Sequence, residues 1–537
     1  MRNYRFISIV AIMLTLVTGM AASVIYAQNH REEIHDSYTT ALTKAPHEEK
    51  PLEYISENYN VKEGFCSHLP IVVMDTNGVE PPVNTYFDNT HTYAGIGIYV
   101  PKEDVEPYVD GEILLYNSEE GINSLADQPV TKSLMRIKRR GNTSMTFEKA
   151  QWLVKLVTES GQDREVDILG MGAEHEWILN GSMYDKSMLR NYLAYSVISR
   201  IMKYTPDSRF CEVLIKNGTT YSYQGVYLIC ENIKQGTNRV DIAEYKESNT
   251  FNSYLLRKDR YDVEALTLEN YGRIQGFNSE YLALLYPSKY RVTTDMTEYV
   301  NRDISYIEKI LYSENPKIFG SYKDVLDVDS FVDYFLVNEF LGNYDAGNNS
   351  TYFYKDLGGR LSMGPVWDFD GAMDNYIYEP LDTESLAFYT KPWFDCLCKD
   401  LNFVKKLEKR YTKLRQGPLS NDYVIGKIDE ITAYLGGAIE REWMRWGHWY
   451  TTDNVYSLED YTGSDGITLK RNAVTYEDEI YRIKTVLREH ADSISTGLKM
   501  LEKNAELTTG LSKWMGWLLL LAAVVFLIPA IFVSYKK

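Results

Sequence analysis

Cysteine is scarce in this sequence of 537 residues, which contains only five. Five cysteines are too few to cross-link a chain of this length with disulfides, and no cysteine–histidine spacing is typical of a zinc site. Cys211 and Cys230 flank a predicted hairpin and leave one disulfide open, whereas Cys396 and Cys398 lie too close in the sequence for an easy bridge. The cysteine content therefore excludes a disulfide-rich scaffold and gives no indication of a zinc module.

Basic charge is also in short supply, because 57 lysines and arginines stand against 75 aspartates and glutamates, for a net charge of −18. Nucleic-acid-binding proteins need a basic patch, and no basic stretch offsets this deficit. We therefore exclude nucleic acid as a partner and expect an acidic enzyme to favour basic protein substrates. The sequence has no internal repeats, and its length suffices for one large domain or two closely packed lobes.

Two long apolar runs lie at the ends of the chain. Residues 1–27 predict a signal peptide or an uncleaved signal anchor, because a basic start precedes the apolar run. Residues 513–537 predict a transmembrane helix and a basic tail, because about 20 apolar residues entered by tryptophans end in two lysines. Basic flanks favour the cytoplasmic side of a membrane. We therefore expect a protein of the cell membrane whose body is extracytoplasmic.

The body between these ends changes its periodicity along the chain. Short alternating runs with Asn-Gly and Asp-Gly turns predict strands from residue 69 to residue 257, interrupted by one helix that runs from its N-cap Asp185 to about residue 202. Amphipathic runs predict helices from residue 295 to residue 503, the last of them over residues 477–503. The fold class is therefore α+β, with a β-rich N-terminal part and a helical C-terminal part. We expect a linker over residues 28–64, one domain over residues 65–450 and a helical extension over residues 451–512.

The most informative stretch of the body is residues 338–371. Asp345 follows an apolar helical run, and Asn349 lies within one turn of it. An alternating segment, a Gly-Gly turn and a second apolar run then lead to Asp368, which predicts a β-hairpin. This hairpin would return Asp368 to the same edge as Asp345.

Two carboxylates at one edge suit phosphoryl transfer. One carboxylate faces the acceptor hydroxyl, while the second, together with an amide oxygen, holds Mg²⁺ on the phosphates. Protein kinases arrange these parts in the same order along the chain. The alternative is structural, because Asp, Asn and Gly favour turns and a capped loop before an ordinary hairpin would contain the same residue types.

A second candidate lies upstream, where two predicted strands are joined by the turn RGNTS, which begins at Arg140 and includes Asn142. The backbone N–H groups of such a turn, with a lysine on the returning strand, can cover nucleotide phosphates. Lys155 stands on that strand and Lys149 stands just before it, and the choice between them stays open. The alternative is a surface hairpin with a solvated lysine.

These motifs resemble those of the CotH-type atypical protein kinases. The resemblance rests on NYDAGNN, PVWDFDGAMDN, RGNTS with KAQWLVKL after it, YDKSMLRN and GVYLICENI, and it covers residues 65–450. It implies a two-lobed, atypical protein-kinase-like fold, with ATP and Mg²⁺ as cofactors and a serine-rich protein as the acceptor.

The resemblance also implies roles for individual residues. Asp345 would be the catalytic aspartate, and Asp368 and Asn349 would bind the metal. The family often places its asparagine where Ser350 stands here, so Asn348, Asn349 and Ser350 all stay open as the second metal ligand. The residues expected at the nucleotide are Arg140, Asn142, Lys149, Lys155 and Glu231.

Two positions of the predicted strand region carry alternatives of their own. Glu231 ends a segment that resembles the adenine-binding edge of the family, but a carboxylate at a strand end also caps the next turn. The family tends to have an acidic residue where Arg257 or Lys258 stands, so the resemblance assigns no role to that region.

The function that we expect is a membrane-tethered kinase that transfers the γ-phosphate of ATP to Ser or Thr of a secreted or envelope protein. Two alternatives stay open. A pseudokinase or surface binding scaffold would keep the fold without chemistry, which the shortage of ATP outside the membrane favours and the retention of Asp345 and Asp368 disfavours. An enzyme with the same site would instead transfer AMP.

Overall fold

The computed structural model describes Tyr38, residues 42, 43 and 45, and residues 54–534 except 94–95, 119–120, 378, 453, 455–456, 463–465 and 467. Beyond residue 507 it describes only the backbone. The predicted signal segment over residues 1–27 and the side chains of the predicted span over residues 513–537 therefore lie outside the described residues. Among the residues that are described, no helix is both long and apolar enough to cross a membrane.

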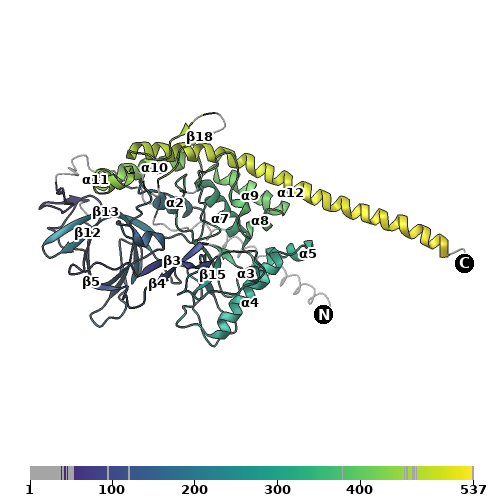
Figure 1. Cartoon of the computed structure of the whole chain (residues 1–537), viewed down its shortest axis with the longest axis horizontal. Coiled ribbons are helices and arrows are strands. Elements are labelled where there is room, and N and C mark those ends of the chain that lie inside the picture. The colour runs from purple at the N-terminus through teal and green to yellow at the C-terminus, as the bar shows by residue number, and fades with distance from the viewer. Residues whose placement is uncertain are drawn as a thin grey trace, which may run out of the picture.

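Seven strands of the N-terminal part close into a β-barrel (Figure 1). In order around the barrel they are β11 (Glu176–Asn180), β13 (Thr220–Glu231), β12 (Ser208–Asn217), β2 (Ile71–Asp75), β5 (Val109–Tyr116), β7 (Thr131–Arg139) and β8 (Trp152–Val157). Successive residues of a strand face opposite ways, and in β7 every second residue from 133 to 139 is buried. The barrel interior is an apolar cluster that includes Val72, Ile113, Met135, Val154 and Val213.

The neighbours in the barrel are antiparallel except for β2 and β12, which pair in parallel. β12 and β13 form the hairpin that the sequence predicts. Cys211 lies opposite Tyr227 in this hairpin and Cys230 lies opposite Ser208, so the two thiols are not opposite one another. Both cysteines are free, and the disulfide that the sequence left open does not form.

Short elements surround the barrel. The hairpin of β3 (Thr85–Tyr93) and β4 (Ile96–Pro101) contacts the turn after β7, because the hydroxyls of Tyr99 and Thr143 lie 3.0 Å apart. The other short elements are β1 (Cys66–Ser67) paired with β6 (Asn123–Ser124), β9 (Val166–Asp167) paired with β10 (Ala173–Glu174), β18 (Tyr461–Thr462) paired with β19 (Thr468–Leu469), and the 3₁₀ turns η2 (Thr143–Thr146) and η3 (Phe388–Thr390).

A second sheet and a set of helices form the C-terminal part. The sheet is antiparallel, in the order β15 (Tyr281–Tyr286), β14 (Tyr254–Asp259), β16 (Thr351–Lys355) and β17 (Ser362–Met363). The helices are α2 (Arg190–Ile198), α3 (Tyr271–Ile274), α4 (Thr294–Leu311), α5 (Pro316–Phe319), α6 (Tyr322–Val325), α7 (Val328–Leu341), α8 (Phe394–Leu397), α9 (Leu401–Leu414), α10 (Asn421–Leu435), α11 (Gly437–Thr451) and α12 (Tyr476–Ser534). This arrangement confirms the predicted α+β class and the predicted hairpin of β16 and β17.

Helix α2 joins the two parts. Every residue of α2 is buried, and the helix packs in one apolar cluster with Phe210 and Leu228 of the barrel and with residues of α7. The sequence predicts Asp185 as the N-cap of this helix, but α2 begins only at Arg190. Asp185 instead orders the turn before it, because its carboxylate accepts the backbone N–H groups of Ser187 at 3.0 Å and of Arg190 at 2.9 Å.

Helix α12 packs along the helical part and then continues beyond the body of the molecule (Figure 1). The side chains that it buries include Ile483, Leu487, Ile494 and Leu498, which share one face of an amphipathic helix. The amphipathic helix predicted over residues 477–503 is therefore confirmed.

Candidate active site

Asp345 lies in the loop that follows α7. Gly342 ends the helix in the left-handed conformation, with φ of +61°, which is common at helix C-termini. Asp345 Oδ1 then accepts the side-chain amide of Asn349 at 3.2 Å, and its carbonyl oxygen accepts the Asn349 N–H at 2.9 Å. The loop folds back on itself and holds Asp345 and Asn349 together.

The β16–β17 hairpin returns the chain to Asp368 beside this loop. Ser350 Oγ donates to Asp368 Oδ2 at 3.2 Å, and Asn343 Nδ2 donates to the Asp368 carbonyl at 3.3 Å. Ser350 and Asp368 have φ of +47° and +63°, values that side-chain-bearing residues rarely adopt. Such backbone strain persists where surrounding contacts over-determine it, which is common in active sites. The structure thus brings Asp345, Asn349 and Asp368 to one place.

Negative charge accumulates at this place. Burial, together with the nearby carboxylates of Asp370 and Asp345, raises the pKa of Asp368 to about 7, although the charge of Arg140 opposes the shift. Carboxylates that repel one another in a buried site favour either a proton or a cation between them. The electrostatics therefore suit the binding of a positively charged group.

The donor atoms present fit Mg²⁺ bound together with phosphates. Asn349 Oδ1 is buried and has no hydrogen-bond partner among the described residues, although its amide nitrogen is engaged. No cluster of three or more acidic, histidine or cysteine side chains in the described part of the chain forms a ready-made metal cage. Mg²⁺ does not need one, because it binds through one or two carboxylates, waters and substrate phosphates. Asp368 and the free amide oxygen of Asn349 supply such a partial set.

Arg140 approaches the aspartates from the barrel. Its guanidinium donates to Gln151 Oε1 at 3.1 Å and lies 5.4 Å from the ring centroid of Trp367, the residue before Asp368. Asn142 lies in the same turn, where its carbonyl oxygen accepts the N–H of Met145 at 3.2 Å. The structure therefore places Arg140 near the carboxylate of Asp368. The backbone carbonyl of Asn142 is used in a hydrogen bond within the turn.

The two candidate lysines have different surroundings. Lys149 Nζ lies 2.5 Å from Glu442 Oε1 of α11, and both side chains are buried, with 1% and 0% exposed. Lys155 pairs with Glu176 on the outer face of the barrel at 2.8 Å, and 33% of its side chain is exposed. Neither ammonium contacts Asp345 or Asp368 in the described part of the chain. Lys149 is thus committed to an internal ion pair, whereas Lys155 keeps access to solvent.

A third lysine, Lys138, was missed by the sequence analysis. It lies on β7 two residues before Arg140, which follows the strand and continues its pairing through its N–H to the carbonyl of Gln151 at 3.0 Å, so strand alternation places both side chains on one face. Burial lowers the pKa of the Lys138 ammonium, an effect that Glu264 opposes and Lys155 reinforces. The ammonium groups of Lys138 and Lys155 lie 5.1 and 5.7 Å from the ring centroid of Tyr108. The sequence does contain a sign of Lys138, because every second residue from 136 to 140 is basic and alternate residues of a strand share one face.

Strand β14 brings an unpredicted carboxylate to the site. Asp259 ends this strand, its side chain is 17% exposed, and burial and the charge of Asp345 raise its pKa against the effect of Arg257. The neighbouring Lys258 donates to the carbonyl of Gly347 in the Asp345 loop at 2.9 Å. The region to which the resemblance assigned no role therefore supports the loop and adds Asp259. Nothing local in the sequence links β14 to this loop.

Asp370 is a further acidic residue that the sequence analysis did not single out. Its carboxylate accepts the hydroxyl of Ser182 and the side-chain amide of Asn191, the latter from α2. Asn191 Oδ1 in turn accepts the N–H of Phe369 at 2.9 Å. These contacts fix the backbone on the C-terminal side of Asp368 to the helix that joins the two parts.

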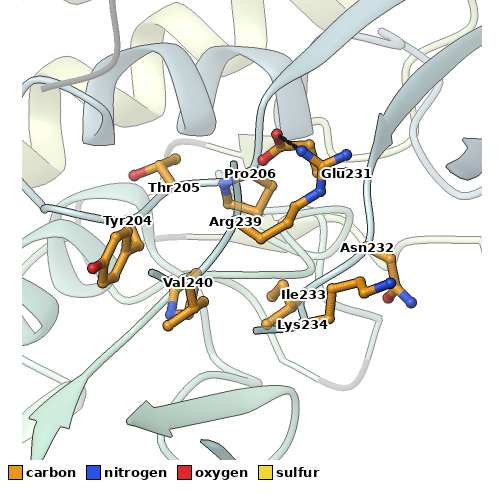
Figure 2. Close-up of a pocket in the computed structure, with 10 residues that line it drawn as sticks. Tyr204, Thr205, Pro206, Glu231, Asn232, Ile233, Lys234, Arg239 and Val240 are labelled. Atoms are coloured by element: carbon orange, nitrogen blue, oxygen red, sulfur yellow. Dashed lines mark hydrogen bonds and ion pairs between the residues drawn. The ribbon is translucent and has the colours of Figure 1, made fainter. Parts of the chain in front are cut away.

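Glu231 lines a small, open hollow where β13 leaves the barrel, with a volume of about 10 Å³, and Pro365 lines the same hollow. Figure 2 shows its carboxylate beside Arg239, with Asn232 and Lys234 on the adjoining backbone; the Glu231–Arg239 ion pair is 2.5 Å long. Glu231 Oε2 also accepts the N–H of Asp207 at 3.0 Å. Burial raises the pKa of Glu231 to about 8, although Arg239 and this N–H lower it in part.

A comparison with protein families places the site in a known context. The family model described as CotH kinase protein matches residues 137–494, which is more than half of the chain. The matched segment contains the turn with Arg140, the loop with Asp345 and the hairpin that returns to Asp368. No curated protein matches the chain.

Proposed function

Because this chain belongs to the CotH kinase protein family, we propose that it is an atypical protein kinase that transfers the γ-phosphate of ATP to Ser or Thr of a protein. The observation that carries the proposal is the convergence of Asp345, Asn349 and Asp368 on one partly buried site, where Asn349 Oδ1 has no partner among the described residues. A site that served only the architecture would have no need of a partly buried carboxylate cluster with an unused ligand atom.

The two aspartates divide the chemistry between them. Asp345 orients the acceptor hydroxyl and takes its proton as the oxygen attacks the γ-phosphorus, and ADP leaves. Asp368 and Asn349 would hold Mg²⁺, which when bound neutralises charge on the phosphates. Arg140, Lys138 and Lys155 line the barrel face and attract the nucleotide phosphates by their charge.

We propose that the nucleotide base lies over the hollow beside Glu231, which at about 10 Å³ is too small to enclose a base and would have to widen. It lies where β13 runs into the segment after the barrel, and the resemblance assigns the adenine-binding edge to this place. Asn232 and Lys234 line it with backbone and side-chain polar groups, and Val240 adds an apolar surface. We propose that Glu231 acts here by fixing Arg239 and the backbone of Asp207, because its carboxylate is already engaged by both.

A pair of lysine variants tests the phosphate assignment. Lys149→Ala leaves the Glu442 carboxylate buried and unpaired, so we expect a loss of about 3–5 kcal/mol in the free energy of unfolding. Lys155→Ala breaks a partly exposed pair, so it should cost about 1 kcal/mol or less in stability but raise the KM for ATP, with a loss of about 10²-fold in kcat/KM. Urea denaturation and steady-state kinetics measure both effects.

The control for this pair is Lys149→Met combined with Glu442→Gln. This double variant removes both buried charges and should recover part of the stability that Lys149→Ala loses. If Lys149→Ala instead folds normally and raises the KM for ATP, while Lys155→Ala does not, Lys149 is the lysine that meets the phosphates.

We further propose that the kinase is tethered to the cell membrane, with its body outside the cytoplasm and a secreted or envelope protein as its acceptor. The support is in the sequence, where apolar runs with basic flanks lie at both ends. Protease added to intact cells should therefore digest the body, residues 30 to 510. Complete protection of the body in intact cells, with digestion after lysis, would place it in the cytosol.

The experiment that tests the function uses two labels of ATP on the purified full chain with Mg²⁺ and a panel of serine-rich and basic proteins. Transfer of label from the γ-position alone supports the kinase. Transfer from the α-position alone indicates that AMP is the group transferred. If the protein binds ATP but neither the panel proteins nor the protein itself becomes labelled, the proposal is overturned and a scaffold is favoured.

A further inference from the structure

The segment after Asp368, residues 371–375, is held by charged groups from the C-terminal extension. Asp374 lies within this segment, and its side chain is only 1% exposed. Arg471 Nε lies 3.0 and 3.1 Å from the two carboxylate oxygens of Asp374, and Arg471 Nη2 donates to the carbonyl of Tyr376 at 2.7 Å. Arg482 Nη1, from α12, donates to Asp374 Oδ2 at 2.9 Å and to its carbonyl at 2.6 Å.

The same network continues into α2. Glu479 of α12 pairs with Arg482 at 2.9 Å and with Arg190 at 2.7 Å, and all three side chains are buried. Arg190 also pairs with Asp185 and donates to the carbonyl oxygens of residues 372 and 373. Three arginines and three carboxylates thus balance one another, and loss of any one leaves a buried charge without its partner.

The backbone that these groups hold is strained. Met373 and Asp374 have φ of +54° and +62°, in the left-handed region that side-chain-bearing residues avoid. The N–H of Met373 donates to the carbonyl of Leu341 at 2.7 Å, at the end of α7 just before the Asp345 loop. The conformation of residues 371–375 therefore depends on contacts with other parts of the chain. The segment contacts the end of α7, just before the loop that contains Asp345, and it follows Asp368 closely along the chain.

We propose that Arg471 and Arg482 are positioning residues for the Mg²⁺ site, so that residues 451–494, which the family match includes, belong to the catalytic domain that the sequence predicts to end at residue 450. This inference rests on the proposed function. Both guanidinium groups act through Asp374, whose backbone is anchored six residues from Asp368. Contacts outside the ligand shell of a metal typically change its affinity by about 10- to 100-fold.

The test uses Arg471→Lys and Arg482→Lys in the full chain, because lysine keeps the charge and loses the forked contact. The matched control is Arg441→Lys, since Arg441 is equally buried, with 1% exposed, and pairs at 2.7 Å with Glu212 of the barrel strand β12. All three variants should lose stability. Only the first two should raise the Mg²⁺ concentration for half-maximal ATP binding, by about 10-fold.

A second measurement needs neither ATP nor metal. Amide hydrogen exchange in residues 366–376 should become faster in Arg471→Lys and Arg482→Lys and stay unchanged in Arg441→Lys. Unchanged exchange in this segment, or an equal increase in the control, would overturn the inference. If exchange becomes faster in the two variants but the wild type binds no ATP with Mg²⁺, the proposed function fails, and the contacts of Arg471 and Arg482 with Asp374 have a structural role only. If exchange responds and the Mg²⁺ dependence does not, Arg471 and Arg482 do not position the metal site.

Discussion

Asp345→Asn should reduce phosphate transfer by about 10²- to 10⁴-fold while leaving ATP binding intact. Asparagine has nearly the same shape as aspartate but cannot accept the proton of the acceptor hydroxyl, and general acid–base catalysis usually contributes a factor of this size. The contacts of Asp345 are with Asn349 in its own loop, so a neutral amide can keep the loop folded. A phosphotransfer assay and calorimetry with ATP and Mg²⁺ on the same preparation measure the two effects.

The control for this variant is Asp356→Asn on the same stretch of chain. Asp356 lies in the exposed turn after β16, where it accepts the N–H groups of Ala243 and Leu357, each within 2.8 Å. Its substitution should lower stability slightly and leave transfer unchanged. Equal transfer by Asp345→Asn and the wild type would remove Asp345 from the catalytic role.

Asp368→Asn should abolish ATP binding that depends on Mg²⁺, with a rise in Kd of about 10²-fold or more. The substitution removes the anionic oxygen that Mg²⁺ prefers, and a factor of 10² corresponds to about 2.8 kcal/mol. Transfer should be lost with binding, which separates Asp368 from Asp345. Titration of ATP into both variants, with and without Mg²⁺, distinguishes the two roles.

The same variant should behave differently in chelator, where no metal is present. The pKa of Asp368 is raised to about 7 in the folded protein from 3.8, so the stability that its protonated form contributes is complete below 3.8 and is lost as the pH rises to about 7. The wild type should therefore lose stability between about pH 4 and about pH 7, and Asp368→Asn should lose less. A wild type with no such loss, or a variant less stable than the wild type at pH 8, would contradict the buried carboxylate cluster.

The excess of negative charge explains why the segments that contain Asp345 and Asp368 are held by so many hydrogen bonds and ion pairs. Asp259, Asp345, Asp368 and Asp370 converge from three elements, and Arg140 is the cation that opposes the raised pKa values of both Asp368 and Asp370. Mutual repulsion would open such a site if its backbone were free. The hydrogen bonds from Asn191 and the contacts of Arg471 with Asp374 hold it closed without neutralising it.

The sequence by itself determined the features that depend on local periodicity. The hairpin between Asp345 and Asp368 was predictable because strand alternation, a Gly-Gly turn and a second apolar run occur within one short stretch. The α+β class and the amphipathic face of α12 were predictable for the same reason, since side chains repeat with the period of their element. The candidate aspartates were visible because their motifs are local.

Tertiary structure alone decided which distant groups meet. Lys149 and Glu442 lie 293 positions apart, and only the packing of α11 on the barrel turns a candidate phosphate lysine into a buried ion pair. Asp374 and Arg482 are separated by 108 positions, and their contact makes the extension part of the site. The parallel pairing of β2 with β12 closes the barrel across a similar distance. Periodicity shows which face of an element is buried, but the partner of a buried charge depends on how the elements pack together.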